Sequence, residues 1–229
     1  MRPPSLERGR DGTALWRNSG ADRLVEVADW DALAEVYDRQ LLLERRAVDA
    51  ALDLADAGLN DVLLDAGTGT GAVLRALAAR PVRPRTAIGV DASARMLDRV
   101  PLLPAGWHVE QADLTQLPAE DSTFDVAIAS YVLHLLEPGD RRAVLGELRR
   151  VLRPGGRLIT VTVYVPERPR LRPLGTALAK LARAYPQRLG GLQPLDPRPD
   201  LIDAGFTPQT ARTVLLGYPS LCVAARAPG

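Results

Sequence analysis

The residues of this sequence that point most directly to chemistry are a carboxylate and three glycines within VLLDAGTGTGA, residues 62–72. The apolar run at the start is typical of a buried strand, and glycines after such a strand let the backbone approach a ligand with no side chain between them. Asp65 stands two residues before the first glycine, Gly67, and brings a negative charge to the mouth of the turn. This charge disfavours a pyrophosphate and suits an ammonium group or a water bound to one.

Read alone, the same glycines also fit a nicotinamide dinucleotide. Residues 67–72, GTGTGA, satisfy the dinucleotide pattern GxGxxA, and Asp91 lies 20 residues beyond Gly71 at the end of the next predicted strand. A carboxylate at that place can accept hydrogen bonds from both ribose hydroxyls. An NAD-dependent oxidoreductase is therefore one alternative for this chain.

A further acidic step, Ala112-Asp113-Leu114, follows the third predicted strand. It offers a hydrogen-bond acceptor and an apolar side chain, which suit the amino edge and the ring face of an adenine. The chain also closes with two predicted strands joined by a tight turn, an antiparallel pair that the usual dinucleotide domain lacks. A ligand with an amino acid at one end and an adenosine at the other fits all three features.

From residue 60 onward, short apolar runs alternate with amphipathic helices, and such alternation implies parallel pairing of the strands. We expect an α/β fold: a doubly wound, mostly parallel seven-stranded sheet with a C-terminal antiparallel strand pair and an N-terminal helical layer. The predicted strands are residues 61–67, 86–91, 107–111, 124–130, 156–165, 206–216 and 220–227. The predicted helices are residues 29–58, 70–79, 93–100, 140–152, 176–184 and 200–205.

Local signals set the expected ends of two of these helices. Gly58 is placed to stop the first one. In the helix over 140–152, apolar residues form one stripe that must cover a sheet face, Asp140 can cap the start, and Pro154 with Gly155 ends it.

The chain divides into three expected parts. Residues 1–20 read as a flexible tail, 21–59 as an N-terminal helical cap, and 60–229 as the α/β domain. A segment rich in proline and arginine at about 165–198 is a candidate flap over a pocket, and a plain surface insertion is the alternative.

Composition excludes several classes of function. The net charge of +1, with 46% hydrophobic residues, is typical of a soluble globular protein. It argues against a duplex-binding module whose affinity depends on contacts with phosphate groups. No apolar run reaches the roughly 20 residues of a membrane helix, and no secretory signal precedes the domain. The single cysteine, Cys222, lies in an apolar stretch, which indicates a buried thiol in a reducing compartment. We expect a cytoplasmic monomer or homodimer that acts on a small molecule, with no nucleic acid and no membrane as partner.

Five segments resemble the motifs of class I S-adenosylmethionine-dependent methyltransferases, in the order and spacing of that family. They are DAGTGTG (65–71), GVDAS with RML (89–97), ADLTQLP (112–118), FDVAIASYVLHLL (124–136) and LRPGGRLIT (152–160). The resemblance covers about residues 60–226 and is nearest to small-molecule members, including quinone-biosynthesis and natural-product methyltransferases. It implies a Rossmann-like fold and S-adenosylmethionine as cofactor. It also implies methyl transfer to an O, N, S or C atom of a small organic metabolite, with S-adenosylhomocysteine as product.

The resemblance also implies roles for single residues. Gly67 and Gly69 would approach the methionine part of the cofactor, and Asp65 would hold its ammonium group through the loop or a water. Asp91 would accept the ribose hydroxyls, and Asp113 the adenine amino group. The other residues expected to line the cofactor are Thr68, Ala92, Met96, Leu114 and Ser130.

Methyl transfer from a sulfonium is an in-line displacement that needs positioning more than catalytic groups. For a phenol, thiol or carbon acid a base with a pKa near neutral helps, and His134, just beyond the fourth predicted strand, is the candidate. Tyr37 resembles a tyrosine that lines the methyl donor in relatives. No Asp-Asn pair follows Ser130, so we expect no metal. A fold relative that binds the cofactor, and binds or cyclises its substrate without methyl transfer, is the first alternative to a methyltransferase, and the NAD-dependent oxidoreductase is the second.

Overall fold

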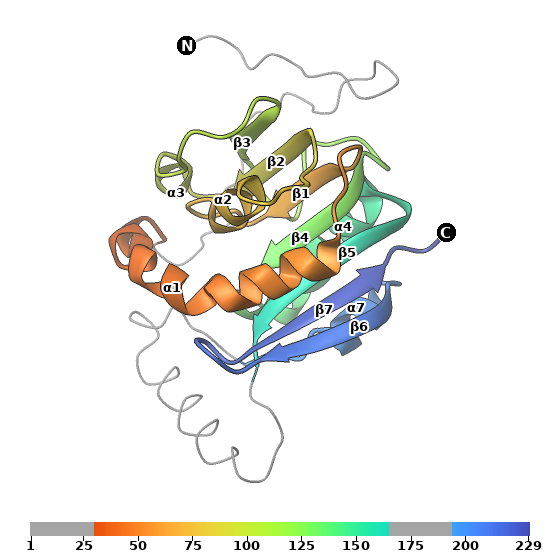
Figure 1. The fold of residues 1–229 in the computed structure, drawn as a ribbon. Coiled ribbons are helices and arrows are strands. Elements are labelled where there is room, and N and C mark those ends of the chain that lie inside the picture. The colour runs from red at the N-terminus through yellow and green to blue at the C-terminus, as the bar shows by residue number, and fades with distance from the viewer. Residues whose placement is uncertain (1–29, 165–193) are drawn as a thin grey trace.

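Seven strands in the described part of the chain form one sheet (Figure 1). The computed structural model describes the backbone of residues 30–164 and 194–229, with side chains from residue 43 onward. The strands are β1 (Val62–Ala66), β2 (Thr86–Asp91), β3 (Trp107–Gln111), β4 (Phe124–Ser130), β5 (Leu152–Val163), β6 (Thr207–Val214) and β7 (Ser220–Arg226). Their order across the sheet is β3-β2-β1-β4-β5-β7-β6.

The pairing of the strands follows the expected pattern. Strands β1 to β5 pair with one another in parallel, and β7 runs antiparallel to both of its neighbours, β5 and β6. All five residues of β1 are buried, as expected of a central strand that is covered on both faces. The doubly wound, mostly parallel seven-stranded sheet with its C-terminal antiparallel pair is therefore confirmed.

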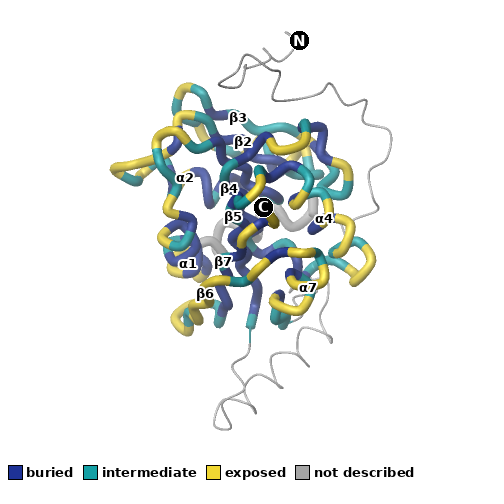
Figure 2. The backbone as a smooth tube through the Cα atoms, turned by 90° about the vertical axis from the view of Figure 1, so that its right-hand side faces the viewer, coloured by how far each residue is buried: buried dark blue, intermediate teal, exposed yellow. Residues whose placement is uncertain are grey.

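Helices cover both faces of the sheet, as Figures 1 and 2 show from two directions. The helices are α1 (Trp30–Ala55), α2 (Ala72–Ala78), α3 (Ala94–Leu97), the short 3-10 helix η1 (Leu133–Leu135), α4 (Pro138–Val151) and α7 (Arg198–Asp203). Helix α1 crosses one face in front of the sheet, beside α2, whereas α4 and α7 lie on the opposite face. This arrangement leaves the carboxyl ends of the parallel strands at one edge, where ligands bind in open α/β sheets.

Two apolar clusters, one on each face, hold these layers together. Under α1 and α2 the cluster includes Val48, Leu52, Leu74, Ile128 and Val161. Under α4 and α7 it includes the following residues: Phe124, Leu145, Leu148, Leu158 and Leu201. Because alternate strand residues point to opposite faces, β4 and β5 contribute to both clusters.

The predicted strands agree with the structure better than the predicted helix ends. Strands β2, β3 and β4 have the expected bounds, whereas α2 and α3 are shorter than expected. Gly71 is left-handed with φ 79° just before α2, so residues 70 and 71 belong to the turn. Ser93 caps α3 by accepting a hydrogen bond from the Met96 amide, which starts that helix one residue later than expected.

The predicted ends of α4 and α1 are wrong. Helix α4 begins at Pro138, which is favoured at the first helical position, so Asp140 lies in the first turn and does not cap the helix. Leu152 is already extended, and β5 starts there, so Pro154 and Gly155 lie within a strand. Helix α1 ends at Ala55, before Gly58, because Asp56 adopts φ 43°.

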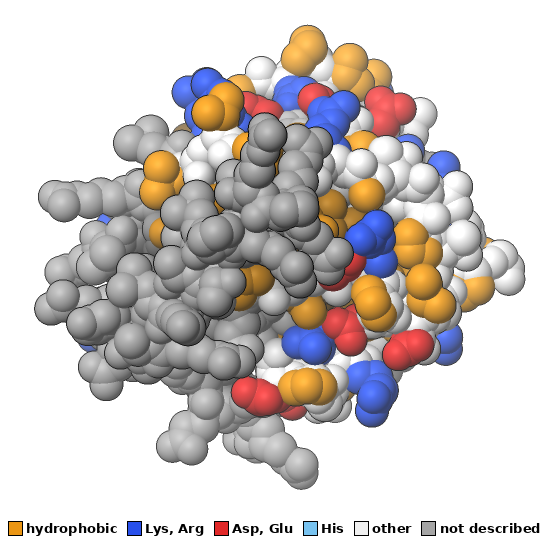
Figure 3. Space-filling model, turned by 90° about the horizontal axis from the view of Figure 1, so that it is seen from below, with side chains coloured by type: hydrophobic (Ala, Val, Ile, Leu, Met, Phe, Trp, Pro, Cys, Tyr) orange, Lys and Arg blue, Asp and Glu red, His pale blue; other side chains and the backbone are white. Residues whose placement is uncertain are grey.

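Several expectations fall on residues outside the described ranges. They are the tail at 1–20, most of the flap at 165–198 and the helix at 176–184. The division into cap and domain stays a prediction. Within the described ranges, no helix is long and apolar enough to cross a membrane. On the face shown in Figure 3, the acidic and basic side chains that are drawn in colour are interspersed.

We predict that Leu145→Ala lowers the free energy of unfolding by about 2–5 kcal/mol, because Leu145 is completely buried between α4 and the sheet and its loss leaves a cavity. Urea denaturation followed by circular dichroism measures this change. Leu102→Ala is the matched control, since that leucine is fully exposed, and we expect a change within about 0.5 kcal/mol. Equal effects of the two substitutions would contradict the packing described here.

Candidate active site

The glycine turn after β1 is held tightly against β2. The amides of Gly67 and Thr68 both donate to the Val90 carbonyl at 2.8 Å, and Gly67 has φ 73°. A Cβ at Gly67 would come within 2.3 Å of Val132 Cγ2. The turn therefore needs glycine for its backbone angle and for the close approach of the segment that follows β4.

Asp65 is a completely buried carboxylate beneath this turn. The Thr68 hydroxyl donates to its Oδ2 at 2.6 Å, and its Oδ1 has no hydrogen-bond partner among the described residues. Burial raises the pKa of Asp65 to about 7, the Thr68 bond opposes this, and the nearby charge of Asp91 adds to it. A buried acceptor without a partner is costly, so this oxygen marks a place for a donor, preferably a cation.

Asp91 ends β2 and is held by backbone donors from both sides. Its Oδ2 accepts from the Gly69 amide and its Oδ1 from the Ser93 amide, both at 2.9 Å. Burial raises the pKa of Asp91, and these hydrogen bonds oppose the rise. Because each carboxylate oxygen accepts more than one hydrogen bond, both remain available to a pair of hydroxyls.

The expected adenine-binding residues lie around α3 and the end of β3. Met96 is buried in α3, and the half-buried Ala92 accepts a bond from the Gln111 amide side chain through its carbonyl at 2.8 Å. Asp113 Oδ1 accepts from the amide and hydroxyl of Thr115, both at 2.8 Å, in a tight turn. Leu114 is half-buried and packs against the apolar cluster under α4.

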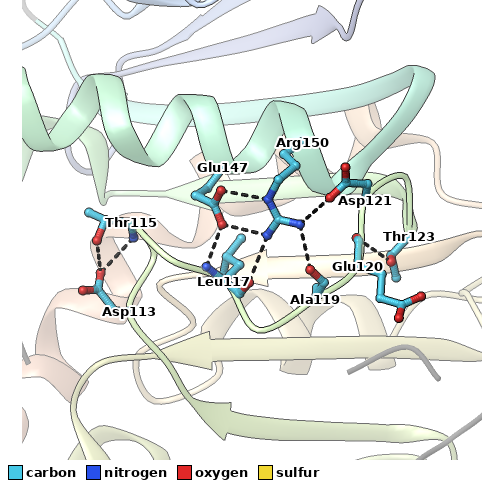
Figure 4. A network of polar contacts seen from close by, with 9 residues as sticks. All are labelled: Asp113, Thr115, Leu117, Ala119, Glu120, Asp121, Thr123, Glu147 and Arg150. Carbon is cyan, nitrogen blue, oxygen red and sulfur yellow. Dashed lines mark hydrogen bonds and ion pairs between the residues drawn. The ribbon is translucent and has the colours of Figure 1, made fainter. Parts of the chain in front are cut away.

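A guanidinium group holds the loop that carries Asp113 and Leu114 (Figure 4). Arg150 of α4 donates to the carbonyls of Leu117 and Ala119 at 3.0 and 2.8 Å. It also donates to both carboxylate oxygens of Glu147 at 2.8 Å. This set of bonds fixes the loop on α4 without contributing an atom to the expected pocket.

The segment after β4 contains a strained tyrosine. Tyr131 has φ 59°, an uncommon angle for a bulky residue, and its amide donates to the Val161 carbonyl at 2.8 Å. Its hydroxyl lies 2.7 Å from Ser220 Oγ, at the start of β7. The hydroxyl of the preceding residue, Ser130, is buried without a hydrogen-bond partner among the described residues. Strain of this kind is characteristic of functional sites.

His134 lies in η1 and is 4% exposed. Neither ring nitrogen has a hydrogen-bond partner among the described residues, and the ring packs edge-on against Tyr131 with centroids 6.0 Å apart. Burial lowers the pKa of His134 to about 3, so the ring is neutral at pH 7. A base role needs a ring that takes up a proton near pH 7, and this environment works against it.

The structure brings together residues that the sequence did not single out. Glu44 of α1 is 5% exposed, and its charge helps to raise the pKa of Tyr131. The sequence offered one signal for Glu44, namely a charged residue on the same predicted helix as the apolar Ala47 and Val48. The side chain of Tyr37, an expected site residue in α1, lies outside the described residues. Among the residues that the structure describes, no three His, Cys, Asp or Glu side chains are grouped as a metal would require.

Comparisons with known proteins agree with this geometry. Residues 63–156 match the family described as "Methyltransferase domain". The chain is 38% identical over 178 residues to the ubiquinone/menaquinone biosynthesis C-methyltransferase of Syntrophotalea carbinolica, covering 71% of this chain and 70% of that protein. It spans a smaller part, 32% to 61%, of three other curated relatives.

Solved structures show the same fold. A putative methyltransferase in a complex with a methyltransferase activator of Haloferax volcanii has a TM-score of 0.71 at 18% identity, with 90% of this chain and 100% of that chain covered. An S-adenosylmethionine-dependent methyltransferase of Mesorhizobium loti has a TM-score of 0.60 at 21% identity, with 80% and 97% covered. The chain belongs to the class I S-adenosylmethionine-dependent methyltransferases, and S-adenosylmethionine is its cofactor.

The residues present fit this cofactor. Asp65 Oδ1 is a buried acceptor with no donor among the described residues, and an ammonium group or its bound water would supply one. The glycine turn lies above it, with the side chain of Val132 where a Cβ of Gly67 would stand. Asp91 and Asp113 follow at the ends of β2 and β3, in the order in which ribose and adenine extend from the methionine part.

We predict that Asp65→Asn has opposite effects on stability and on binding. In the wild type, the folded-state pKa of about 7 exceeds the usual 3.8, so the free energy of unfolding falls as pH rises from about 4 to about 7 and stays low above. Asparagine does not ionise, so we expect Asp65→Asn to raise the free energy of unfolding of the cofactor-free protein at pH 8 by on the order of 1–3 kcal/mol. Affinity for S-adenosylhomocysteine should fall by about 10-fold or more, because a charge-assisted bond is lost.

Urea denaturation at pH 5 and pH 8, together with calorimetry, tests both effects. Asp203→Asn is the control, because that aspartate is exposed on α7. If Asp65→Asn keeps full affinity, or destabilises the protein at pH 8, the carboxylate is not the buried charge inferred here.

We predict that Arg150→Ala loosens the loop over residues 112–121. The loss of the guanidinium bonds should lower the free energy of unfolding by about 1–3 kcal/mol and weaken the binding of S-adenosylhomocysteine. Hydrogen exchange of the loop amides and calorimetry measure these changes. Arg142→Ala on the exposed side of the same helix is the control, and faster exchange in that variant too would contradict a specific role for Arg150.

Proposed function

We propose that this chain transfers the methyl group of S-adenosylmethionine to a small organic acceptor at the carboxyl ends of β4 and β5. The observation that carries the proposal is the buried oxygen of Asp65 beneath the glycine turn, which has no hydrogen-bond partner among the described residues, with Asp91 and Asp113 following at or just after the ends of β2 and β3. When bound, the cofactor supplies a methyl group activated by the positive charge of its sulfur. The chain then has to align the acceptor with this group and exclude water.

Each expected site residue has a place in this proposal. Asp65, with Thr68 as its hydrogen-bond donor, holds the ammonium group, and the backbone at Gly67 and Gly69 lies along the methionine part. Asp91 accepts the ribose hydroxyls. The adenine lies between α3 and the loop after β3, and the residues around it are Ala92, Met96, Asp113 and Leu114.

The methyl acceptor lies beside the segment after β4 in this proposal. Ser130, Tyr131 and His134 present buried polar atoms there, and two of the three side chains have no hydrogen-bond partner among the described residues. A neutral His134 can orient a polar group of the acceptor as donor or acceptor. Tyr37 stays a candidate on α1.

A quinol ring is the first acceptor to test, since the relative at 38% identity acts in ubiquinone and menaquinone biosynthesis by its printed name. The atom that receives the methyl group stays open among O, N, S and C. A cytoplasmic enzyme that works as a monomer or homodimer, without nucleic acid, stays a prediction.

The alternative of a fold relative that binds the cofactor without transferring methyl predicts binding but no labelled product. The alternative of an NAD-dependent oxidoreductase predicts tight binding of NADH. Family membership gives the NAD-dependent oxidoreductase no support. The buried carboxylate of Asp65 also disfavours it, because a diphosphate would lie at the same turn.

We predict that the protein binds S-adenosylhomocysteine at least about 100-fold more tightly than NADH in calorimetry, because the buried carboxylate favours a cation over a diphosphate. Incubation with methyl-labelled S-adenosylmethionine and a panel of reduced quinones, phenols, thiols and amines should yield a labelled small molecule. Asp65→Asn should reduce the yield. Tight cofactor binding with no labelled product from this panel or from a cell extract would favour the binding-only alternative.

A further inference from the structure

Glu44 is a buried carboxyl group that is not among the residues expected to contact the cofactor. It lies on α1 and is 5% exposed. Burial raises the pKa of Glu44 to about 7. Buried glutamates are uncommon, and perturbed acids beside a ligand site are candidates for function.

Helix α1 passes in front of the sheet (Figure 1), and its turn around Glu44 lies beside the start of β7. The Tyr218 amide donates to the Leu43 carbonyl at 3.2 Å, and the Cys222 thiol contacts the Ala47 carbonyl at 3.5 Å. Both contacts are at the start of β7, where Ser220 pairs with Val163 at the end of β5. Glu44 therefore lies at the end of the strands where the acceptor has to bind.

The segment after β4 lies between α1 and the cofactor turn. Tyr131, the first residue after β4, packs in one apolar cluster with Ala47 and Val48 of α1. The charge of Glu44 helps to raise the pKa of Tyr131. The next residue, Val132, lies against Gly67, where a Cβ would come within 2.3 Å. Glu44 and the methionine end of the cofactor thus lie on two sides of the same segment.

Tyr131 and His134, the ionisable groups beside Glu44 after β4, are unsuited to accept a proton. Ser220 Oγ donates to the Tyr218 carbonyl at 2.8 Å, so the Tyr131 hydroxyl donates to Ser220 and keeps its proton, which its raised pKa also favours. Burial lowers the pKa of His134 to about 3, whereas it brings that of Glu44 to about 7. Burial thus favours the neutral form of both groups, but only Glu44 keeps a pKa near the working pH, where a base works best.

We propose that the Glu44 carboxylate is the base that takes the proton of the methyl acceptor, and that the acceptor presents a phenol or enol hydroxyl. This inference rests on the proposed function and names its substrate class. In the transfer, the acceptor oxygen bonds to the methyl carbon, and the bond from that carbon to sulfur breaks with its electron pair on sulfur. The hydroxyl proton passes to Glu44, which releases it to water.

Other charged groups around α1 do not replace Glu44 in this role. Asp49 and Asp53 of α1 pair with Arg80, and Asp53 also contacts Arg212 of β6. Among the side chains that the structure describes, the remaining titratable groups of α1 and of the elements packed against it near Glu44 are the following: Arg45, Arg46, Arg75, Arg95, Asp98, Tyr131, Tyr164, Tyr218 and Cys222. Burial raises the pKa of Asp65 in the cofactor turn to about 7 as well, so a pH dependence near 7 is assigned to Glu44 only where it is measured with the cofactor bound and is lost in Glu44→Gln.

The first experiment tests contact without turnover. Protein with bound S-adenosylhomocysteine is saturated with 4-nitrophenol, and the colour change of the bound probe is titrated with pH. A phenolate beside an ionised Glu44 is unfavourable, so the two share a proton, and the pKa of the bound probe should be at least about 1 unit higher in the wild type than in Glu44→Gln. Glu137→Gln, an exposed residue, is the matched control and should behave as the wild type.

Equal pKa values in the wild type and in Glu44→Gln, or no binding of the probe, overturn the proposal. The proposal is also overturned if benzylamine binds more tightly than nitrophenol and Glu44→Gln removes this preference, because that result indicates an amine as the methyl acceptor. Circular dichroism checks the fold of each variant, and Glu44→Asp, which keeps the carboxyl group, should retain part of the shift if the glutamine variant is unfolded.

The second experiment uses the acceptor that the labelling assay identifies. With S-adenosylmethionine saturating, so that Asp65 is already paired with the cofactor, the kcat of the wild type should rise with pH through about 7, whereas Glu44→Gln should lose this rise and about 10²–10⁴-fold in kcat. The affinity for S-adenosylhomocysteine should stay within about 3-fold. An unchanged profile in Glu44→Gln overturns the proposal. If the chain binds its cofactor but methylates nothing, the proposed function fails, and the nitrophenol titration still decides whether Glu44 meets a hydroxyl.

Discussion

The rest of the site depends on a carboxylate that is buried beneath a glycine turn. Asp65 has a second acidic group, Asp91, close enough to raise its pKa, and one of its oxygens has no partner among the described residues. Two carboxylates near one turn are stable together only when donors or cations compensate them. The protein supplies Thr68 and backbone amides, and in the proposed binding mode the ammonium group of the cofactor would supply a positive charge.

The fold and the cofactor turn could be predicted because their signals are local. A buried parallel strand is a short apolar run, and a turn against β2 needs glycine, so β2, β3 and β4 appeared in the sequence with their observed bounds. Helix ends were less predictable, since they depend on competition between neighbouring signals. Pro138 started α4 before Asp140 could cap it, and the chain of β5 continued through Pro154 because its partner β4 holds Leu152 in the sheet.

The acceptor side of the site could not be predicted, because it is built from residues far apart in the chain. Glu44, Tyr131 and Ser220 come from a helix, a strand end and a strand start, and only the sheet order brings them together. The sequence offered His134 as a base from its position alone. Its protonation depends on burial by surrounding elements, which spacing along the chain does not reveal.

The strained backbone at Tyr131 connects the two sides of the site. An angle of φ 59° is unfavourable for tyrosine, and it persists because the amide is bound to β5 and the hydroxyl to β7. This geometry places the tyrosine ring in the apolar cluster under α1 and leaves the next residue, Val132, against the glycine turn. A relaxed backbone at this position would break the contact of Tyr131 with β7 or that of Val132 with Gly67, so the strain holds both contacts at one segment. The antiparallel strand β7 therefore supports the glycine turn through Ser220 and Tyr131, although none of the expected cofactor-binding residues lies on it.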